Sequence, residues 1–455
     1  MPHFVEHPVK TMSTLAARKG RSRSTQTNSD KLIPRSRDDV SPTRDKDGAK
    51  SKVASSNTMN LVLGSFFLLL LAYLYHRDGD VSLHTSINPS MLPEASVQAN
   101  EATVAPILRA GGSLSSSLRF VTVVMPSVVN PKQRKRRLEA IADTWGPASR
   151  SIYVIHNVQD EYPNPPNGEW PKILTIPANI TFDDGLPRLN YVIRQVFKDY
   201  SKTDFFYFVN DHTYVIPEHL CFYLLNQDPQ KDLYAGHALK NEREAFNSGA
   251  AGYILSRNSI KRLVERLDDA ENDGEVHHGD SNCVVDQGNK WLQGNPGLVT
   301  AKCLHHSLNT RAIDTRESGK YHRFHAFGLV RSVAGTVDEW YIKKHANLED
   351  SLGFDKSYSR LLAGEACCSA ETISFHYVES SENQALFQIR NTLLQNPDMD
   401  DNALKDLMIQ KWPKDRSEVG YYSQVLPARG KEPETWTGIL AVMRKLSRKE
   451  YELHC

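Results

Sequence analysis

The chain has 455 residues, enough for one large or two ordinary domains with a substantial core. Its 55 lysines and arginines nearly balance 54 aspartates and glutamates, which leaves a net charge of +1. That balance argues against a general nucleic-acid-binding protein, because such proteins normally carry a basic excess.

The N-terminal part of the chain reads as a membrane anchor behind a tail. Residues 1–58 are polar and poor in aromatics, and such a stretch cannot bury enough apolar surface to order itself, so we expect a disordered tail. Residues 59–76 are expected to be a transmembrane signal anchor, because 17 largely apolar residues from Met59 can just span a bilayer. Twelve Lys and Arg precede this run, and only Arg77 directly follows it. The charge bias predicts a type II topology, with a cytoplasmic tail and a lumenal domain.

The short span and the cysteines indicate a compartment. A span of this length suits a thin bilayer, so we expect the membrane of the Golgi or early secretory pathway. All six cysteines follow the anchor, and an even number in an oxidising lumen indicates disulfide bonds, with a zinc site as the alternative. Adjacent cysteines rarely bond to each other, so Cys367 and Cys368 are each expected to have a distant partner. The glycosylation sequon at Asn179 is lumenal in this topology.

Residues 77–118 contain Ser, Ala and Pro and are interpreted as a flexible stem. Residues 119–380 are expected to form the globular domain. Its expected elements are strands at 120–125, 151–155 and 205–209 and helices at 132–145 and 189–200. Strands that alternate with helices predict an α/β fold, with a mixed, mostly parallel sheet flanked by helices.

Two polar segments stand where such a sheet would bind a ligand. Asn210-Asp211-His212 follow an apolar strand, and ligands bind at the carboxyl ends of parallel strands. A carboxylate and an imidazole there can bind a divalent metal that neutralises a diphosphate, although a polar turn is the alternative. His376 lies in a strand-like run just after the adjacent cysteines, so a disulfide-pinned strand could hold its imidazole for a metal. A buried structural histidine is the alternative.

Five blocks of the chain match, in order, the motifs of one enzyme family. The blocks are Lys135-Arg136-Arg137 with Ala142–Gly146, Asn210–Val215, Asn247–Ser256, Asp314-Thr315-Arg316 with Phe324–Phe327, and Cys367-Cys368-Ser369 with Ser374–Val378. Taken with the membrane topology, they resemble the inverting β-1,3-glycosyltransferases of the fringe and core 1 galactosyltransferase group. The resemblance covers about residues 120–380.

The resemblance implies a GT-A fold, a UDP-sugar donor and Mn²⁺. It implies transfer of a hexose, with galactose expected, to a glycan acceptor, β-1,3 to O-linked N-acetylgalactosamine. Carried over, the metal ligands are His212 and His376, with Asp211 nearby. The family's acidic motif reads D-D-D-T-Y-V, so Asn210 and His212 replace two aspartates here. Manganese tolerates imidazole, but a site with two histidines carries less negative charge, and we expect a weaker affinity.

The resemblance also implies a catalytic base and contacts to the donor. Asp286 aligns with the carboxylate that activates the acceptor hydroxyl, and Asp280 is the fallback, with a solvated surface aspartate as the alternative. The residues expected to bind the donor are Asn210, Asp211, Arg188, Gly249 and Gly252. Lys135 is a second candidate for the diphosphate. Small residues around Gly249 also suit simple tight packing, and Ala250 replaces a glycine of the family's loop.

Residues 381–455 are expected to form a C-terminal helical extension, with helices near 384–394 and 439–446. It contains no chemical motif, and packing on the domain or binding a partner are both open. Three functions compete: an active glycosyltransferase, a catalytically silent homologue acting as a chaperone, and a tethered carbohydrate-binding protein. We favour the enzyme, with a UDP-sugar, a glycan acceptor and the membrane as partners, no nucleic acid, and a homodimer as the assembly to test.

Overall fold

The computed structural model describes residues 118–156, 170–241, 244–272, 283, 285, 289–345, 348, 352, 354, 358, 362–414, 426–427 and 433–448. All of them belong to one compact unit. The expected tail, the signal anchor and residues 77–117 of the stem lie outside the described residues. Within the described part of the chain, no helix is both long enough and apolar enough to cross a membrane.

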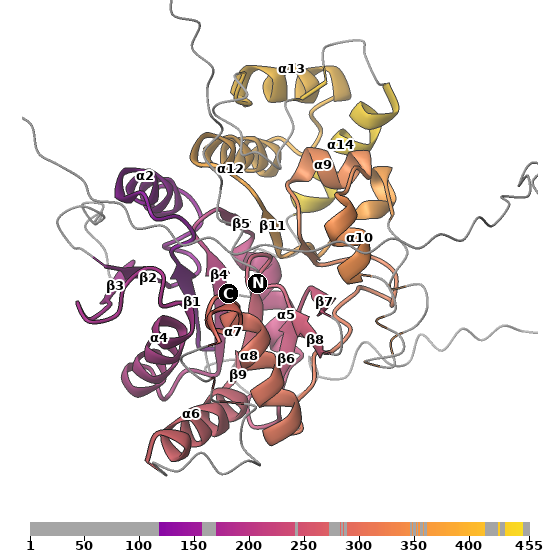
Figure 1. The fold of residues 1–455 in the computed structure, drawn as a ribbon. Coiled ribbons are helices and arrows are strands. Elements are labelled where there is room, and N and C mark those ends of the chain that lie inside the picture. The colour runs from indigo at the N-terminus through magenta and orange to yellow at the C-terminus, as the bar shows by residue number, and fades with distance from the viewer. Residues whose placement is uncertain are drawn as a thin grey trace, which may run out of the picture. The chain divides into compact units, whose positions relative to one another are not determined.

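A six-stranded sheet forms the centre of the domain, with the strand order β3-β2-β1-β4-β9-β6 (Figure 1). The strands are β1 Phe120–Met125, β2 Ser151–Ile155, β3 Lys172–Thr175, β4 Phe205–Asn210, β6 Tyr234–Gly236 and β9 Tyr253–Ser256. The first four strands in this order run parallel, while β9 is antiparallel to both β4 and β6. The expected mixed, mostly parallel sheet is therefore confirmed, as are the strands placed at 120–125, 151–155 and 205–209.

Two small sheets extend this framework. One has the order β10-β11-β5, with β10 Phe324–His325, β11 Ser374–His376 and β5 Thr213–Val215. Only Asp211 and His212 separate β4 from β5, and the antiparallel pairing of β11 with β5 sets His376 opposite Thr213. The other is a two-stranded pair of β7 Ala238–Asn241 and β8 Glu244–Asn247.

The central sheet has an apolar core on each face because its strands alternate the sides of successive residues. In β1, Val121 and Val123 enter one core cluster, while Phe120 and Val124 enter the other. The first cluster is completed by α4 Gly185–Asp199, α6 Arg257–Asn272 and α8 Pro296–Lys302. The second is completed by α2 Pro131–Ala142, α5 Pro217–Leu225 and α9 Leu329–Ala334. The helices expected at 132–145 and 189–200 correspond to α2 and α4.

The C-terminal extension packs on the domain. Its helices are α12 Ser380–Gln395, α13 Asp401–Lys411 and α14 Pro433–Leu446, which lie together in Figure 1. Leu393, Met408 and Trp436 belong to the same core cluster as Phe120 and Val124 of β1. Of the two open interpretations, packing on the domain is therefore what these helices do, and they enlarge its core.

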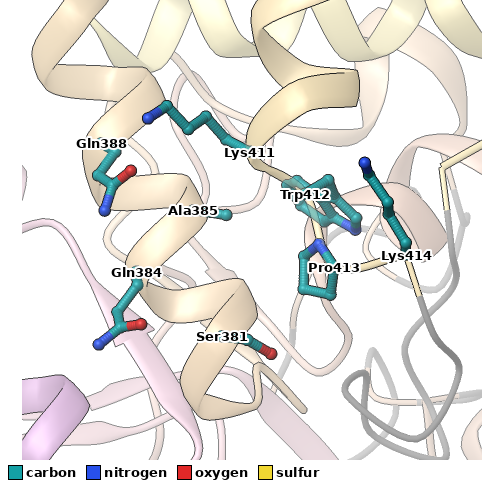
Figure 2. Close-up of a pocket in the computed structure, with 8 residues that line it drawn as sticks. All are labelled: Ser381, Gln384, Ala385, Gln388, Lys411, Trp412, Pro413 and Lys414. Carbon is teal, nitrogen blue, oxygen red and sulfur yellow. The ribbon is translucent and has the colours of Figure 1, made fainter.

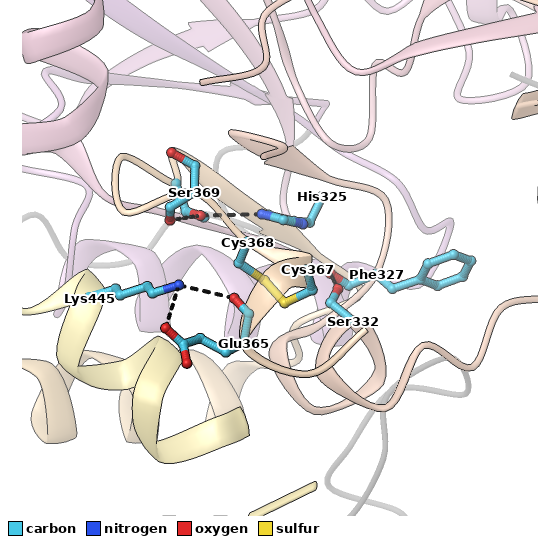
Figure 3. Close-up of a disulfide and its surroundings, with 9 residues drawn as sticks. His325, Phe327, Ser332, Glu365, Cys367, Cys368, Ser369 and Lys445 are labelled. Carbon is cyan, nitrogen blue, oxygen red and sulfur yellow. Dashed lines mark hydrogen bonds and ion pairs between the residues drawn. A yellow bond between two sulfur atoms is a disulfide. The ribbon is translucent and has the colours of Figure 1, made fainter. Parts of the chain in front are cut away.

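The expectation for the adjacent cysteines was wrong. Cys367 and Cys368 are bonded to each other (Figure 3). Cys283 is bonded to Cys303. The short helix η4, Gly364–Cys367, ends at Cys367, and the chain becomes extended at Cys368, with both side chains buried. This turn encloses both thiols in one buried region, where each is the other's nearest partner. Cys221 is also disulfide-bonded.

Candidate metal and donor site

Three segments meet at the carboxyl edge of the central sheet. Ser127 follows β1, Asp211 and His212 follow β4, and His376 ends β11. The parallel pairing of β1 with β4 brings their carboxyl ends to the same edge, and the register of β11 with β5 adds His376. The Nε2 atoms of His212 and His376 lie 2.7 Å apart. The structure thus brings together the two histidines predicted as metal ligands.

The environment of His376 fixes its protonation. Its Nδ1 lies 3.2 Å from the carbonyl oxygen of Ala326, which can only accept, so Nδ1 carries the proton. Burial, reinforced by the neighbouring His212, lowers the pKa of His376 well below its usual value. The ring is therefore neutral near pH 7, and its Nε2 presents a bare lone pair toward His212.

The hydrogen bonds of Ser127 determine the tautomer of His212. The Ser127 hydroxyl donates its one proton to Asp211 Oδ1 and accepts from Arg137 Nη1 at 2.9 Å. It has no second proton for His212 Nδ1, which lies 2.7 Å away, so Nδ1 of His212 is the donor. The Nε2 atom of a neutral His212 then also presents a lone pair. Two lone pairs at 2.7 Å repel each other unless a proton or a metal cation lies between them.

Asp211 acts on His212 from the other side of the ring. Burial alone would raise the pKa of Asp211, but Arg137, His212 and Ser127 together hold it at about 2. Its Oδ1 lies 3.3 Å from Arg137 Nη1 and 3.4 Å from His212 Nδ1, on the side of the ring opposite Nε2. Asp211 therefore orients His212 and supplies negative charge. Its Oδ2 is buried and has no hydrogen-bond partner among the described residues.

Arg137 ties this site to the C-terminal extension. Its Nε donates to Oε2 of Glu379 at 3.0 Å, and Glu379 caps the start of α12. A second link is the hydrogen bond of 2.9 Å from Thr144 to Asn383. Sequence analysis placed Arg137 in a motif without predicting a role for it, and it singled out neither Ser127 nor Glu379. The one available signal was the basic helix that contains Arg137.

Tyr377 has a backbone conformation that bulky residues rarely adopt. Its φ is 59°, in the left-handed region, and such residues cluster at functional sites. Its ring centroid lies 3.7 Å from that of His376 and 5.5 Å from that of His212. The backbone N–H of the next residue, Val378, donates to the carbonyl oxygen of His212 at 2.9 Å. This turn locks the two histidines together.

Buried guanidinium groups lie near the same edge. Arg188 sits over the Phe182 ring at 4.4 Å, and Arg134 approaches that ring at 5.4 Å. Burial, followed by the charge of Arg134, lowers the pKa of Arg188 to about 10, while Asp211 opposes the shift. The Arg188 Nε is buried without a hydrogen-bond partner in the described part of the chain. A buried cation with a spare donor suits an anionic ligand. Lys135, in contrast, is exposed and lies beside Glu139.

The glycine-rich loop supports the strands that carry the histidines. A Cβ atom on Gly252, whose φ is +93°, would lie 2.3 Å from the Tyr207 hydroxyl, so only glycine fits there. The Ala251 carbonyl accepts hydrogen bonds from Tyr207 and from Ser374 of β11. At Gly249 an added Cβ would meet only ordinary contact. Gly252 is thus accounted for by packing, whereas at Gly249 packing does not require a glycine.

The remaining predicted residues are Asp286, Asp280 and Asn210. Asp286 and its fallback Asp280 lie outside the described residues, so the catalytic base stays a prediction. Asn210 ends β4 and is half-buried.

An open groove lies between α12 and the end of α13, with Gln384 on one side and Trp412 on the other (Figure 2). None of the residues predicted from the sequence lines it.

The fold and the site define an α/β protein with a pair of buried imidazoles at the carboxyl edge of its sheet. No family model matches the chain. A curated relative, glycoprotein-N-acetylgalactosamine 3-beta-galactosyltransferase 1 of Xenopus laevis, is 27% identical over 191 residues. That match covers 41% of this chain and 45% of the relative, so the chain spans under half of the relative's length. It confirms the resemblance to the β-1,3-galactosyltransferase group.

Solved structures show a weaker likeness. The glycosyltransferase GlyE of Streptococcus pneumoniae TIGR4 has 10% sequence identity and a TM-score of 0.26, over 66% of each chain. Its apo form gives 11% identity and the same TM-score. At that TM-score the likeness does not establish a shared fold.

Proposed function

We propose that the chain is an inverting glycosyltransferase with a GT-A fold. It transfers a hexose, with galactose as the first donor to test, from a UDP-sugar to a glycan acceptor, β-1,3 to O-linked N-acetylgalactosamine. The sequence similarity to a galactosyltransferase supports this assignment. The observation that carries it is the pair of imidazole lone pairs that converge at the carboxyl edge of the sheet.

The site fits a divalent metal, because the Nδ1 atoms of His212 and His376 donate elsewhere and their Nε2 atoms face each other. Mn²⁺ would bind to their Nε2 atoms, with Asp211 as the nearby carboxylate, and when bound it supplies positive charge for the departing diphosphate. The two Nε2 atoms, now 2.7 Å apart, would have to separate slightly to hold the ion between them. Arg137 and Ser127 hold Asp211 and His212 in place for this role.

The donor and the acceptor are proposed to bind at this same carboxyl edge of the sheet. Arg188 binds the diphosphate oxygens with its buried guanidinium, and the absence of a side chain at Gly249 lets the sugar approach the backbone. Asp286 is the proposed base that takes the proton of the acceptor hydroxyl. Residues 59–76 anchor the chain in the Golgi membrane in a type II orientation, and a homodimer is the proposed assembly.

One observation favours a second candidate, a catalytically silent homologue that acts as a chaperone or binds carbohydrate. A His212 with protons on both ring nitrogens would donate to His376 without any metal, while Asp211 balances its charge. An ionised aspartate at this position, as in the family's motif, could not donate. The replacement at His212 therefore permits a hydrogen bond between the two imidazoles in a site that does no chemistry.

A UDP-release assay separates the two candidates. The full chain in detergent is incubated with Mn²⁺ and either UDP-galactose, UDP-glucose or UDP-N-acetylglucosamine, with an O-linked N-acetylgalactosamine glycopeptide as acceptor. The enzyme releases UDP only with acceptor present and loses this release on chelation. Absence of release with every donor, together with unchanged UDP binding after chelation, would favour the silent homologue.

A further inference from the structure

A second group of histidines lies away from the carboxyl edge of the sheet. His305 and His306 are consecutive residues near the end of the π-helix η2, Cys303–Ser307, and both contact Glu244 at the start of β8. His305 Nδ1 lies 3.0 Å from Glu244 Oε1, and His306 Nε2 lies 2.7 Å from Oε2. One atom of each side chain lies within 4.8 Å of the others. Three ligand atoms of metal-binding type therefore converge on one point.

The backbone around this group is built to hold it. Consecutive residues of an α-helix point about 100° apart, but the wider turn of the π-helix leaves the two imidazole rings 4.1 Å apart and tilted by only 30°. The Cys283–Cys303 disulfide fixes the first residue of this helix. Isolated π-helical turns occur frequently at functional sites. The disulfide and the unusual turn thus present two imidazoles to one carboxylate.

We propose that Glu244, His305 and His306 form a zinc site. Two imidazoles and a carboxylate are ligands that zinc favours, and three protein ligands leave a fourth position for water or a ligand. The side chain of Glu244 is 10% exposed and that of His306 is 42% exposed, so the carboxylate is desolvated while the open position faces solvent. Ligand atoms of a tetrahedral zinc ion stand about 3.3 Å apart, so the two histidine nitrogens must move slightly away from the Glu244 oxygens that they now contact at 3.0 and 2.7 Å.

The site joins two segments that are 61 residues apart in sequence. Glu244 begins β8, which ends at Asn247, directly before the glycine-rich loop. A bound zinc ion would link β8 to the disulfide-bonded π-helix. It would thereby restrict the motion of the strand that leads into that loop. The ligands are different residues from His212 and His376, so the inference does not depend on the proposed transferase activity.

Zinc binding is measured on the purified full chain carrying His376→Ala, which removes the other imidazole pair. After chelation and dialysis, the chain is titrated with Zn²⁺ alone by calorimetry, and Co²⁺ is added separately to read the coordination geometry from its visible spectrum. We expect one equivalent of zinc and the intense visible bands of four-coordinate Co²⁺. Loss of a single ligand in Glu244→Gln should weaken zinc at least about tenfold, since even outer partners of ligands contribute that much.

Glu265→Gln is the matched control, because Glu265 is an exposed carboxylate on α6 that pairs with the exposed Lys261. It should bind zinc like its parent. If Glu244→Gln fails to fold, which its unfolding midpoint in chelator reveals, His306→Ala is used instead, since that side chain is the most exposed ligand. Equal zinc affinity in parent and ligand variants, or no zinc binding in the parent, would overturn the site and leave a hydrogen-bonded cluster.

Discussion

The two histidine groups contain the same residue types, two histidines and one carboxylate, but the carboxylate lies in a different place in each. At the carboxyl edge of the sheet, Asp211 contacts His212 on the Nδ1 side and leaves the two Nε2 atoms to face each other. In the second group, Glu244 lies between the histidines and contacts both. In the proposed metal sites, the first carboxylate orients a ligand, whereas the second is itself a ligand. On these proposals, the position of the carboxylate decides whether a histidine pair suits a metal shared with a substrate or a metal held by the protein alone.

Loss of the proposed catalytic base should reduce turnover more than any other change considered below. The transferase site needs such a base, whereas the Glu244 group does not. Asp286→Asn keeps the size of the side chain but removes its ability to accept a proton. General-base catalysis contributes about 100- to 10,000-fold, so turnover should fall by at least about 100-fold with UDP binding nearly intact. Turnover is measured by UDP release at saturating donor. Asp280→Asn tests the fallback residue and should keep the turnover of the parent, since Asp286 is the proposed base. Full activity in Asp286→Asn removes this residue from the mechanism.

The next effect tests how much the buried carboxylate of the first site depends on its cation. Arg137 is buried against Asp211 and Glu379, so Arg137→Ala leaves Asp211 as an uncompensated charge in the core. Breaking such a pair typically costs about 3–5 kcal/mol of unfolding free energy. Urea denaturation measures it. Lys261→Ala, which breaks an exposed pair on α6, should change the midpoint little. Equal losses in both variants would contradict the account of the site.

A smaller effect concerns histidines that belong to neither group. Burial lowers the pKa of His219 to about 3, that of His237 to about 4 and that of His325 to about 3. Between these values and about 6.5 the unfolded chain binds more protons than the folded chain, so stability falls as the pH drops through this window and is fully present above it. Each group should contribute about 1 kcal/mol between pH 7.5 and 5.5. Urea midpoints that do not change with pH would contradict the assignment of neutral core histidines.

The sequence predicted what is local and missed what is distant. The apolar run of β4 indicated a buried strand, and its end placed Asp211 and His212 at the edge of the sheet. The motif around His376 indicated the second imidazole. The contact of Arg137 with Glu379 spans 242 residues, and no periodicity reveals such a pair. The second histidine group was missed for the same reason, since the π-helix that aligns its rings depends on tertiary packing.

The error at Cys367 and Cys368 comes from a backbone turn that the sequence did not reveal. We expected distant partners because adjacent cysteines rarely bond to each other, and that expectation took no account of η4, whose last residue is Cys367. Lys445 of α14 fixes this helix by contacts to the carbonyl and carboxylate oxygens of Glu365 (Figure 3). The backbone turn that permits the bond thus depends on the C-terminal extension, whose role the sequence left open.

We propose that His212 and His376, and not the group around Glu244, bind the metal that contacts the diphosphate of the donor. The most direct measurement is calorimetric binding of UDP to the full chain with and without Mn²⁺, compared between His376→Ala and His306→Ala. We expect His376→Ala to abolish the metal-dependent part of UDP binding, because it removes one of the two imidazoles proposed to bind the metal. His306→Ala should bind UDP like the parent. Unchanged metal-dependent binding in His376→Ala, or its loss in His306→Ala alone, would contradict the account.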